Sequence, residues 1–324
     1  MRMQSKWKVA AALPVLAAAL WWAWPDAAAP EGRAPTLLAH RGIAQRFDER
    51  GLANETCTAQ RMLPSDHAFL ENTLPSIEAS FAAGADIVEI DVHPTTDGQF
   101  AVFHDWALEC RTDGRGPTRA HSMEQLKRLD VGYGYTADGG RTYPFRGRGV
   151  GLMPSLDEVL AAFPQRRFLV NVKSRDPEEG RKLAAALRRY PAQQRARIAV
   201  YGGDEPVAEF RRLVPEVRTA SRATLKSCLL RYLAFGWSGH VPESCTRSVV
   251  LVPVNFAGLL WGWPHRFQQR MERAGSEIFA VGPYGGGFTT GIDTPEDLAR
   301  LPRDYAGGIW TNEIAWCAQA LRRR

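Results

Sequence analysis

The sequence predicts an α/β fold in which eight parallel strands close into a barrel with long loops over its mouth. Short apolar runs alternate with amphipathic segments over roughly 270 residues, a pattern typical of a parallel sheet covered by helices. Ionisable residues follow several of these runs, and such residues gather at the C-terminal mouth of a closed barrel. The chain of 324 residues suits one barrel domain. We therefore expect a leader at 1–29, a linker at 30–35 and the barrel at 36–324.

Nine segments qualify as strands, although a barrel of this kind needs only eight. One of the nine must therefore be an irregular segment or the arm of a hairpin, and 218–221 is the weakest candidate. The predicted strands are 36–39, 87–92, 100–104, 167–173, 197–201, 218–221, 249–254, 278–281 and 308–311.

Helical spacing of apolar residues and helix-capping residues predict the segments between the strands. Ser155 followed by Glu158 forms a capping box, and Thr294 before Pro295 marks another helix start. Residues 43–70 and 131–152 are polar and read as long loops. The predicted helices are 73–83, 123–129, 155–163, 176–189, 205–213, 224–235, 263–274, 294–300 and 314–322.

Charge is mildly positive and scattered along the chain. Arg2, Lys6 and Lys8 against Asp26 account for +2 of the net +6, so the remainder carries +4. No basic stripe with interleaved aromatic residues is present, which argues against a nucleic-acid partner. A mild positive balance suits an anionic substrate.

The first 29 residues have the pattern of an export segment. A positive start precedes an apolar run of about sixteen residues, and Ala27–Ala29 offer small residues for cleavage. This run is short for a membrane span, although the tryptophans at 21, 22 and 24 also suit an uncleaved anchor. We expect an exported protein, either periplasmic or anchored facing the periplasm, with membrane association only through this segment.

Five cysteines occur, and none forms a Cys-x-x-Cys pair, so a zinc site is unsupported. In an oxidising compartment four of them can form two disulfides. We expect Cys57–Cys110 across the mouth of the site and Cys228–Cys245 around a loop, with buried free thiols as the alternative.

The candidate site lies at the ends of four predicted strands. Glu89 and Asp91 are two residues apart, so both carboxylates point to the same face of their strand. Two like charges on one face repel each other, an arrangement that suits a divalent cation better than it suits stability. The other strand ends supply His40, Arg41, His104, Asn171 and Lys173.

This set contains what metal-assisted cleavage of a phosphate ester requires. Two histidines can transfer protons, oxygen ligands can hold a metal, and Arg with Lys can bind a phosphate. A single histidine at a strand end is more often structural, but two of them in register with Glu-x-Asp and Asn-x-Lys are hard to attribute to chance. Glu71 either reaches the site or simply favours the helix start that follows it. We interpret four further histidines as surface or structural: His67, His93, His121 and His265.

Several blocks together resemble the glycerophosphodiester phosphodiesterase family. The order and spacing within each block match the family over 36–173, and the likeness fades afterwards apart from 308–312. The matching blocks are Leu37–Gly42, Glu71–Leu74, Gly84–Val92, Thr96–Gly98, Ala101–Asp105, Arg111–Gly116 and Pro154–Leu160.

The resemblance implies a TIM-type barrel that hydrolyses glycerophosphodiesters to sn-glycerol 3-phosphate and an alcohol. It implies His40 and His104 as the acid/base pair, with a hydroxyl next to the phosphate as the attacking group. Glu89 and Asp91 would hold Mg²⁺ or Ca²⁺, with Asn171 at the third ligand position. Arg41 and Lys173 would bind the phosphoryl oxygens, and Glu71 is a possible supporting residue.

Two departures from the family bear on the substrate. Asn171 stands where the family has a carboxylate, so one negative charge is missing beside the expected cation. The 43–70 insertion reshapes the mouth, and 259–264 with 282–287 offer either an apolar wall for a choline or acyl group or packing aromatics and turns. An alternative is therefore a lysophospholipid or sphingolipid phosphodiesterase similar to the phospholipase D-type toxins, and another is a non-catalytic envelope protein that binds phosphate or lipid.

Overall fold

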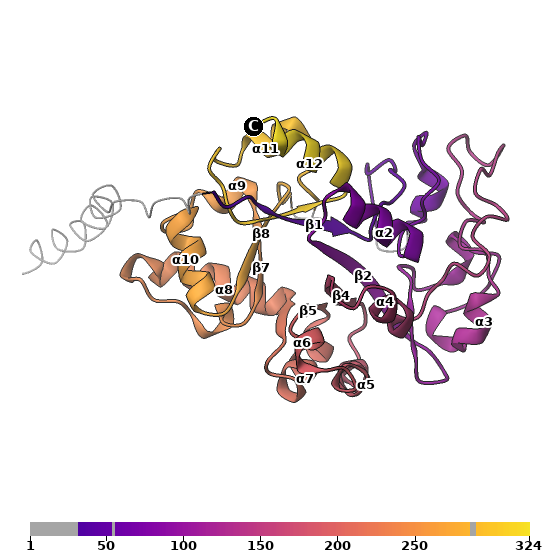
Figure 1. Cartoon of the computed structure of the whole chain (residues 1–324), viewed down its shortest axis with the longest axis horizontal. Coiled ribbons are helices and arrows are strands. Elements are labelled where there is room, and N and C mark those ends of the chain that lie inside the picture. The colour runs from indigo at the N-terminus through magenta and orange to yellow at the C-terminus, as the bar shows by residue number, and fades with distance from the viewer. Residues whose placement is uncertain (1–31, 54–55, 286–289) are drawn as a thin grey trace, which may run out of the picture.

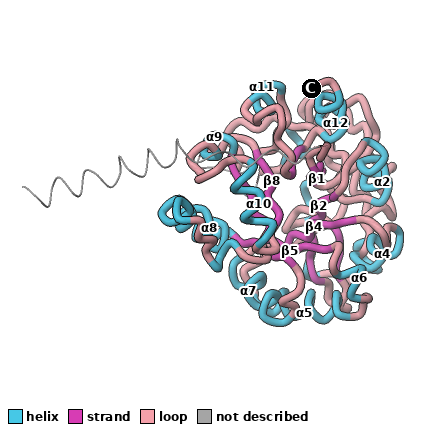
Figure 2. Tube along the Cα trace, turned by 60° about the vertical axis from the view of Figure 1, so that its left-hand side comes forward, coloured by secondary structure: helices cyan, strands magenta, loops and turns pink. Residues whose placement is uncertain are grey.

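Eight apolar runs pair in parallel to form a nearly closed barrel in the computed structural model, which describes residues 32–53, 56–285 and 290–324. The strands lie in the order β6-β5-β4-β2-β1-β9-β8-β7. Helices surround them (Figure 2). The barrel strands are β1 (Thr36–His40), β2 (Ile87–Pro94), β4 (Arg167–Val172), β5 (Ile198–Gly202), β6 (Arg218–Ser221), β7 (Val249–Pro253), β8 (Glu277–Val281) and β9 (Gly308–Thr311).

Parallel registers fix which strand ends meet. β1 pairs with both β2 and β9, and its His40 lies opposite Glu89 of β2. β2 pairs with β4 so that Asp91 lies opposite Asn171. The last gap, between β6 and β7, is bridged by Thr219 and Ser248. The C-terminal ends that the sequence predicted to meet therefore adjoin one another along the sheet.

The ninth strand candidate is the hairpin arm β3 (Phe100–Val102), which runs antiparallel to β2. The prediction that 218–221 is the weakest strand candidate was wrong, because this segment forms β6 between β5 and β7. Its Thr219 and Ala220 are buried, and only a short strand is needed where the barrel closes.

Helices follow most strands and cover the barrel (Figure 1). Their predicted starts hold: Ser155 caps α4 in a capping box with Glu158, and Thr294 caps α11 ahead of Pro295. The longer helices are α2 (Leu74–Ala83), α4 (Leu156–Ala162), α5 (Pro177–Arg188), α7 (Asp204–Leu213), α8 (Arg222–Phe235), α10 (His265–Arg273) and α12 (Ile314–Arg322). The short ones are α3 (Met123–Lys127), α6 (Ala192–Arg195), α9 (Val254–Ala257) and α11 (Pro295–Ala299).

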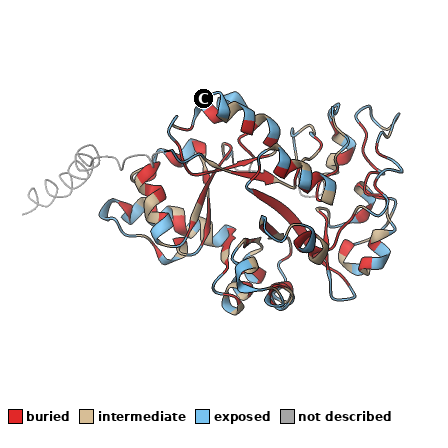
Figure 3. Ribbon diagram, in the orientation of Figure 1, coloured by how far each residue is buried: buried red, intermediate tan, exposed pale blue. Residues whose placement is uncertain are grey.

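Two apolar layers hold the barrel together. Inside it, side chains from alternate strand positions fill the interior, so the barrel is a packed core and not a channel. Outside it, the opposite faces of the strands contact the buried faces of the helices (Figure 3). The interior residues include Leu38, Ile87, Leu169, Ala220, Val249, Phe279 and Trp310.

Disulfides fasten two loops of the described chain. The 43–70 loop contains η1 (Thr58–Arg61) and is joined by the Cys57–Cys110 disulfide to η2 (Leu108–Cys110). A second disulfide, Cys228–Cys245, ties α8 to η5 (Glu243–Cys245). Both predicted pairings are confirmed, and Cys317 is a buried thiol. The remaining one-turn helices are η3 (Thr118–Ala120) and η4 (Gly236–Ser238).

The predicted leader at 1–29 lies outside the described residues. Among the helices of the described part, none has the length and apolar character needed to cross a bilayer.

Candidate active site

Two buried acids lie at the centre of the barrel mouth. Glu89 and Asp91 are fully buried on the same face of β2. The Tyr201 hydroxyl donates to Glu89 Oε1 at 2.7 Å. Asp91 accepts from Asn72 Nδ2 at 3.0 Å and from Asn171 Nδ2 at 2.9 Å. Hydrogen bonds of this kind are what make two adjacent buried carboxylates tolerable.

Arg41 and Lys173 provide positive charge above these acids. Arg41 Nε lies 3.3 Å from Asp91 Oδ2, and Lys173 Nζ lies 3.3 Å from Asp91 Oδ1. Their side chains keep 14% and 13% of their surface exposed, whereas the acids have none. The cations therefore lie between the buried carboxylates and the solvent, where an incoming anion meets them first.

The turn that carries Arg41 has an unusual backbone. Arg41 and Asn72 both adopt positive φ angles, at 62° and 59°, and Asn72 N donates to Arg41 O at 2.9 Å. Gly42 follows with φ 79°, and a Cβ there would lie 2.3 Å from Ser76 Oγ. Non-glycine residues rarely adopt such angles, and clusters of them are typical of functional sites.

His40 is held in one tautomer by its neighbours. Asn312 Nδ2 donates to Asp293 at 2.6 Å, so its Oδ1 faces His40 Nδ1, also at 2.6 Å. His40 Nδ1 must therefore carry the proton and donate it to Asn312. Nε2 keeps its lone pair and accepts from Arg41 Nε at 3.2 Å. The ring also packs against Trp310, with centroids 5.1 Å apart.

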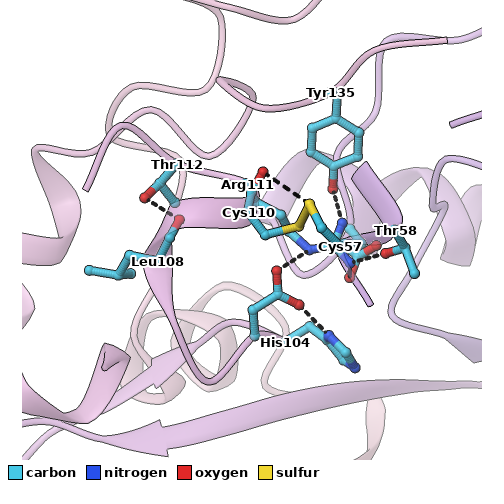
Figure 4. The surroundings of a disulfide bond; sticks show 10 residues. Cys57, Thr58, His104, Leu108, Cys110, Arg111, Thr112 and Tyr135 are labelled. Atoms are coloured by element: carbon cyan, nitrogen blue, oxygen red, sulfur yellow. Dashed lines mark hydrogen bonds and ion pairs between the residues drawn. A yellow bond between two sulfur atoms is a disulfide. The ribbon is translucent and has the colours of Figure 1, made fainter. Parts of the chain in front are cut away.

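His104 is oriented in a similar way by a carboxylate. Its Nδ1 donates to Asp105 Oδ1 at 2.6 Å, which leaves Nε2 free for a reacting group. Asp105 in turn lies beside Arg111, whose Nε is 3.0 Å from Asp105 Oδ2 in an ion pair without hydrogen-bond alignment (Figure 4).

Glu71 connects the two halves of the site. Its Oε1 lies 3.2 Å from Arg41 Nη1 and 3.4 Å from Arg111 Nη2. The supporting position suggested by the sequence is thus an acid between two buried guanidinium groups. All eight predicted residues belong to one connected cluster at the barrel mouth.

Burial sets the protonation of the two histidines. Burial, followed by the charge of Arg41, lowers the pKa of His40 to about 3. Burial, followed by Arg41 and Lys173, lowers the pKa of His104 to about 4. Without a bound anion, both rings are therefore neutral at pH 7, with Nε2 able to accept a proton.

The pKa values of Glu89 and Asp91 are shifted in opposite directions. Burial and the charge of Asp91 raise the pKa of Glu89. Burial alone would raise the pKa of Asp91 too, but Lys173, His104 and Arg41 together lower it. Perturbed carboxyl groups of this kind, placed in a barrel mouth, are typical of functional sites.

The oxygen donors around Glu89 and Asp91 suit a hard divalent cation such as Mg²⁺ or Ca²⁺. Glu89 and Asp91 bring two carboxylates to one face, and the Asn171 amide is the third oxygen source, although its Nδ2 now faces Asp91. Within the described residues, no three or more His, Cys, Asp or Glu side chains group as metal ligands. A cation held here would thus rely on the two acids, one amide oxygen and water.

Several residues that contact the predicted site residues had no predicted role. Tyr201, Asp293, Asn312, Asp105 and Arg111 each contact a predicted site residue or its partner. Asp105 directly follows His104, and Asn312 follows a predicted strand, so position was the available signal. Tyr201 also ends a predicted strand, so the same signal was available for it, whereas Asp293 precedes a predicted helix and gave no such signal.

Residues 259–264 and 282–285 do not form the apolar wall that the sequence offered as one possibility. Trp261 and Trp263 pack against the helix core, and Trp263 stacks on Tyr305. Leu259 and Tyr284 are exposed, while residues 286 and 287 lie outside the described part of the chain. The tryptophans are therefore packing residues. His93, read from the sequence as surface or structural, is buried and contacts the His104 carbonyl at 3.3 Å.

The parallel barrel brings two oriented imidazoles, two acids and two cationic side chains together at its mouth, a set of groups that can perform acid/base chemistry on a bound anion. The family model described as "Glycerophosphoryl diester phosphodiesterase family" matches residues 40–199, the stretch that contains all eight predicted site residues. The chain belongs to this family and is thereby classed with the phosphoric diester hydrolases.

Curated proteins align with the chain, among them an uncharacterized protein and a phosphodiesterase. The protein YqiK of Bacillus subtilis is 26% identical over 249 residues, which cover 75% of this chain and 90% of that one. A glycerophosphodiester phosphodiesterase of Bacillus altitudinis is 28% identical over 156 residues, which cover 46% of this chain and 60% of that enzyme. The chain thus matches less than two thirds of that enzyme's length.

Solved structures show the same fold. The glycerophosphoryl diester phosphodiesterase domain of Rv2277c from Mycobacterium tuberculosis superposes with a TM-score of 0.62 at 18% identity, covering 89% of this chain and 99% of that one. A phosphodiesterase of Oleispira antarctica, in complex with the product sn-glycerol-3-phosphate, gives 0.54 at 18% identity, covering 90% and 98%.

The lowered imidazole pKa values predict that the fold loses stability on acidification. Burial lowers the pKa of His40, His93 and His104 to about 3, 4 and 4, while an unfolded imidazole titrates near 6.5. The unfolded chain therefore binds more protons as the pH falls below about 6.5, and stability declines. Glu89 acts in the opposite sense but involves only one proton. We expect a lower urea midpoint at pH 5 than at pH 7.

The control for this measurement is His93→Gln, which removes one of the three imidazoles and lies outside the predicted catalytic set. It should shrink the loss of stability between pH 7 and pH 5 by about half, because the three imidazole protons less the one that Glu89 holds in the fold leave a net uptake of two on unfolding, and the variant removes one of them. Equal midpoints for the wild type at the two pH values would contradict the assignment of neutral buried rings.

Proposed function

We propose that the protein is a divalent-cation-dependent glycerophosphodiester phosphodiesterase in which His40 and His104 transfer the protons. The proposal rests on the similar hydrogen bonding of the two imidazole rings. Each has its Nδ1 held at 2.6 Å by an oxygen acceptor, which leaves Nε2 as the reactive nitrogen. Two rings prepared in this way at one barrel mouth favour acid/base catalysis over simple binding.

Arg41 and Lys173 would bind the phosphoryl oxygens. Both now contact Asp91, and both remain partly exposed. A phosphate diester carries one negative charge, which a planar guanidinium and an ammonium group recognise well. Binding this anion also raises the pKa of the neighbouring imidazoles, so one of them becomes able to hold the proton that the leaving group needs.

A divalent cation would be held by Glu89 and Asp91, with the Asn171 amide oxygen as a third ligand. When bound, it supplies Lewis-acid stabilisation of charge on the phosphoryl oxygens. The two acids have the residue types that Mg²⁺ and Ca²⁺ prefer, and a cation between them relieves the repulsion of two buried like charges.

In the proposed reaction, the hydroxyl next to the phosphate attacks phosphorus while one imidazole Nε2 takes its proton. The bond from phosphorus to the leaving alcohol breaks, and the other imidazole donates a proton to that alcohol. Water then opens the resulting cyclic phosphate with the two rings in exchanged roles. The products are sn-glycerol 3-phosphate and the free alcohol, and each ring returns to its starting state.

We also propose that the protein is exported. The positive start and apolar run of residues 1–29 support this location, and so do two disulfides, which persist in oxidising compartments. Cell fractionation with amino-terminal sequencing of the recovered protein is the direct measurement, and recovery of an uncleaved chain from the cytoplasm would contradict it.

The acid/base assignment predicts the effect of removing either imidazole. His40→Ala and His104→Ala should each lower kcat on glycerophosphodiesters by about 10²-fold or more, since a positioned acid or base contributes 10²–10⁴-fold. His121→Gln, a histidine outside the site cluster, is the matched control and should retain wild-type turnover. Retention of kcat by His104→Ala would exclude the proposed chemistry.

The same assay defines the substrate class. It should use glycerophosphocholine, glycerophosphoethanolamine, a lysophospholipid and sphingomyelin, each with Mg²⁺, with Ca²⁺ and with a chelator. We expect the glycerophosphodiesters to be cleaved and the chelator to stop the reaction. Cleavage of only the lysophospholipid or sphingomyelin would instead support the toxin-like alternative, and binding without turnover would support the non-catalytic one.

The neutral residue at the third ligand position predicts weak cation affinity that can be raised. Asn171→Glu adds a carboxylate and should tighten binding of the metal alone about tenfold, equivalent to roughly 1.4 kcal/mol. Asn171→Gln, with the same length and no charge, is the matched control. Isothermal titration with Mg²⁺ or Ca²⁺ measures both, and equal affinities for the two variants would place the cation elsewhere.

A further inference from the structure

One buried guanidinium contacts the supports of both predicted catalytic histidines. Arg111 has a side chain that is 3% exposed. Its Nε lies 3.0 Å from Asp105 Oδ2, and its Nη2 lies 3.4 Å from Glu71 Oε1. Both acids are themselves largely buried, at 15% and 4% exposure, so neither is well screened by solvent.

The two acids lead to different imidazoles. Asp105 Oδ1 accepts from His104 Nδ1 at 2.6 Å. Glu71 Oε1 accepts from Arg41 Nη1 at 3.2 Å, and Arg41 Nε contacts His40 Nε2 at 3.2 Å. Displacement of Arg111 would therefore leave two buried carboxylates without their shared cation and would loosen both rings.

A disulfide fixes the guanidinium from two sides. Arg111 directly follows Cys110, and its Nη2 donates to the hydroxyl of Thr58, which directly follows Cys57, at 2.7 Å. Tyr135 accepts from Nη1 at 2.9 Å through its hydroxyl. Figure 4 shows Arg111 between Tyr135 and Thr58, beside the Cys57–Cys110 bond and above His104. The disulfide thus connects the 43–70 loop to the segment that carries Arg111.

The two disulfides of the described chain differ in accessibility. Cys228 and Cys245 are fully buried, whereas Cys57 and Cys110 are only half-buried. A small dithiol can therefore reach Cys57–Cys110 in the folded protein and exchange with it, forming two protein thiols as the dithiol becomes a cyclic disulfide. The Cys228–Cys245 bond provides a control within the same molecule.

We propose that Arg111 is a positioning residue for His104 and Arg41, and that the Cys57–Cys110 disulfide is required to hold it there. The active geometry therefore depends on an oxidised loop as well as on the barrel. This inference rests on the proposed function for its catalytic consequence, but the orientation of the His104 ring can be measured without any substrate.

The first test compares Arg111→Ala, Arg111→Lys and the double variant Cys57→Ser/Cys110→Ser with the control Cys228→Ser/Cys245→Ser. The Arg111 side chain is 3% exposed and contacts Glu71 and Asp105, so we expect its loss to lower kcat about 10- to 100-fold and to leave KM within about threefold. Arg111→Lys should lose less activity than Arg111→Ala, because lysine keeps the positive charge although it lacks the several N–H donors of the guanidinium group. The Cys228/Cys245 control should keep its kcat at temperatures where it is folded.

The second test records the nitrogen chemical shifts of the histidine rings by NMR in the ligand-free protein. In the wild type, His104 should show protonated Nδ1 and bare Nε2. In Arg111→Ala, and in wild-type protein treated with a mild dithiol, the His104 signals should move toward a mixture of tautomers, while those of His265 stay unchanged. Dithiol treatment of the wild-type protein allows the test to be made even if a variant does not fold.

The outcomes separate the two proposals. If His104→Ala retains turnover, the proposed function fails, whatever the ring signals show. If the His104 signals and kcat of Arg111→Ala both equal those of the wild type, Arg111 does not position the ring. If the dithiol opens Cys57–Cys110 and neither kcat nor the His104 signals change, the disulfide has no part in the active geometry.

Discussion

The barrel mouth depends on the burial of two carboxylates on one face of a single strand. Glu89 and Asp91 have no exposed surface, and each would cost several kcal/mol to bury as an isolated ion. Every side chain around them acts to reduce that cost. Arg41 and Lys173 provide charge, Asn72 and Asn171 provide amide protons, and Tyr201 provides a hydroxyl. A cation or an anion that enters this mouth competes for contacts that already exist.

Around this centre the supporting residues form alternating layers of charge. The two acids lie innermost, and Arg41 and Lys173 contact Asp91. Glu71 lies between Arg41 and Arg111, and Arg111 also contacts Asp105. Burial lowers the pKa of Arg111, but Asp105 and Glu71 outweigh it and raise that pKa well above its usual value. The cationic side chains stabilise the ionised forms of Glu71, Asp91 and Asp105, so removal of one cation leaves an uncompensated buried charge.

Much of this arrangement could be predicted from local sequence. Alternation placed Glu89 with Asp91 and Asn171 with Lys173, because the two-residue period of a strand is independent of its context. Capping residues gave the starts of α4 and α11. The role of 218–221 was misjudged because a four-residue strand carries little pattern, and its status depends on the strands at either side. Tyr201 ends a predicted strand but was given no role, and Asp293 was missed because its contacts with Thr311 and Asn312 depend on long-range packing.

The two predicted catalytic histidines are carried by different kinds of structural element, because His104 follows the hairpin formed by β2 and β3. His40 ends a barrel strand that is paired on both sides, whereas His104 follows an arm that pairs with β2 alone. The barrel strands therefore fix one ring, and the buried returning arm of the hairpin places the other. The spacing of the two imidazoles is thus set by a connection separate from the strand pairing that positions the carboxylates, Arg41 and Lys173.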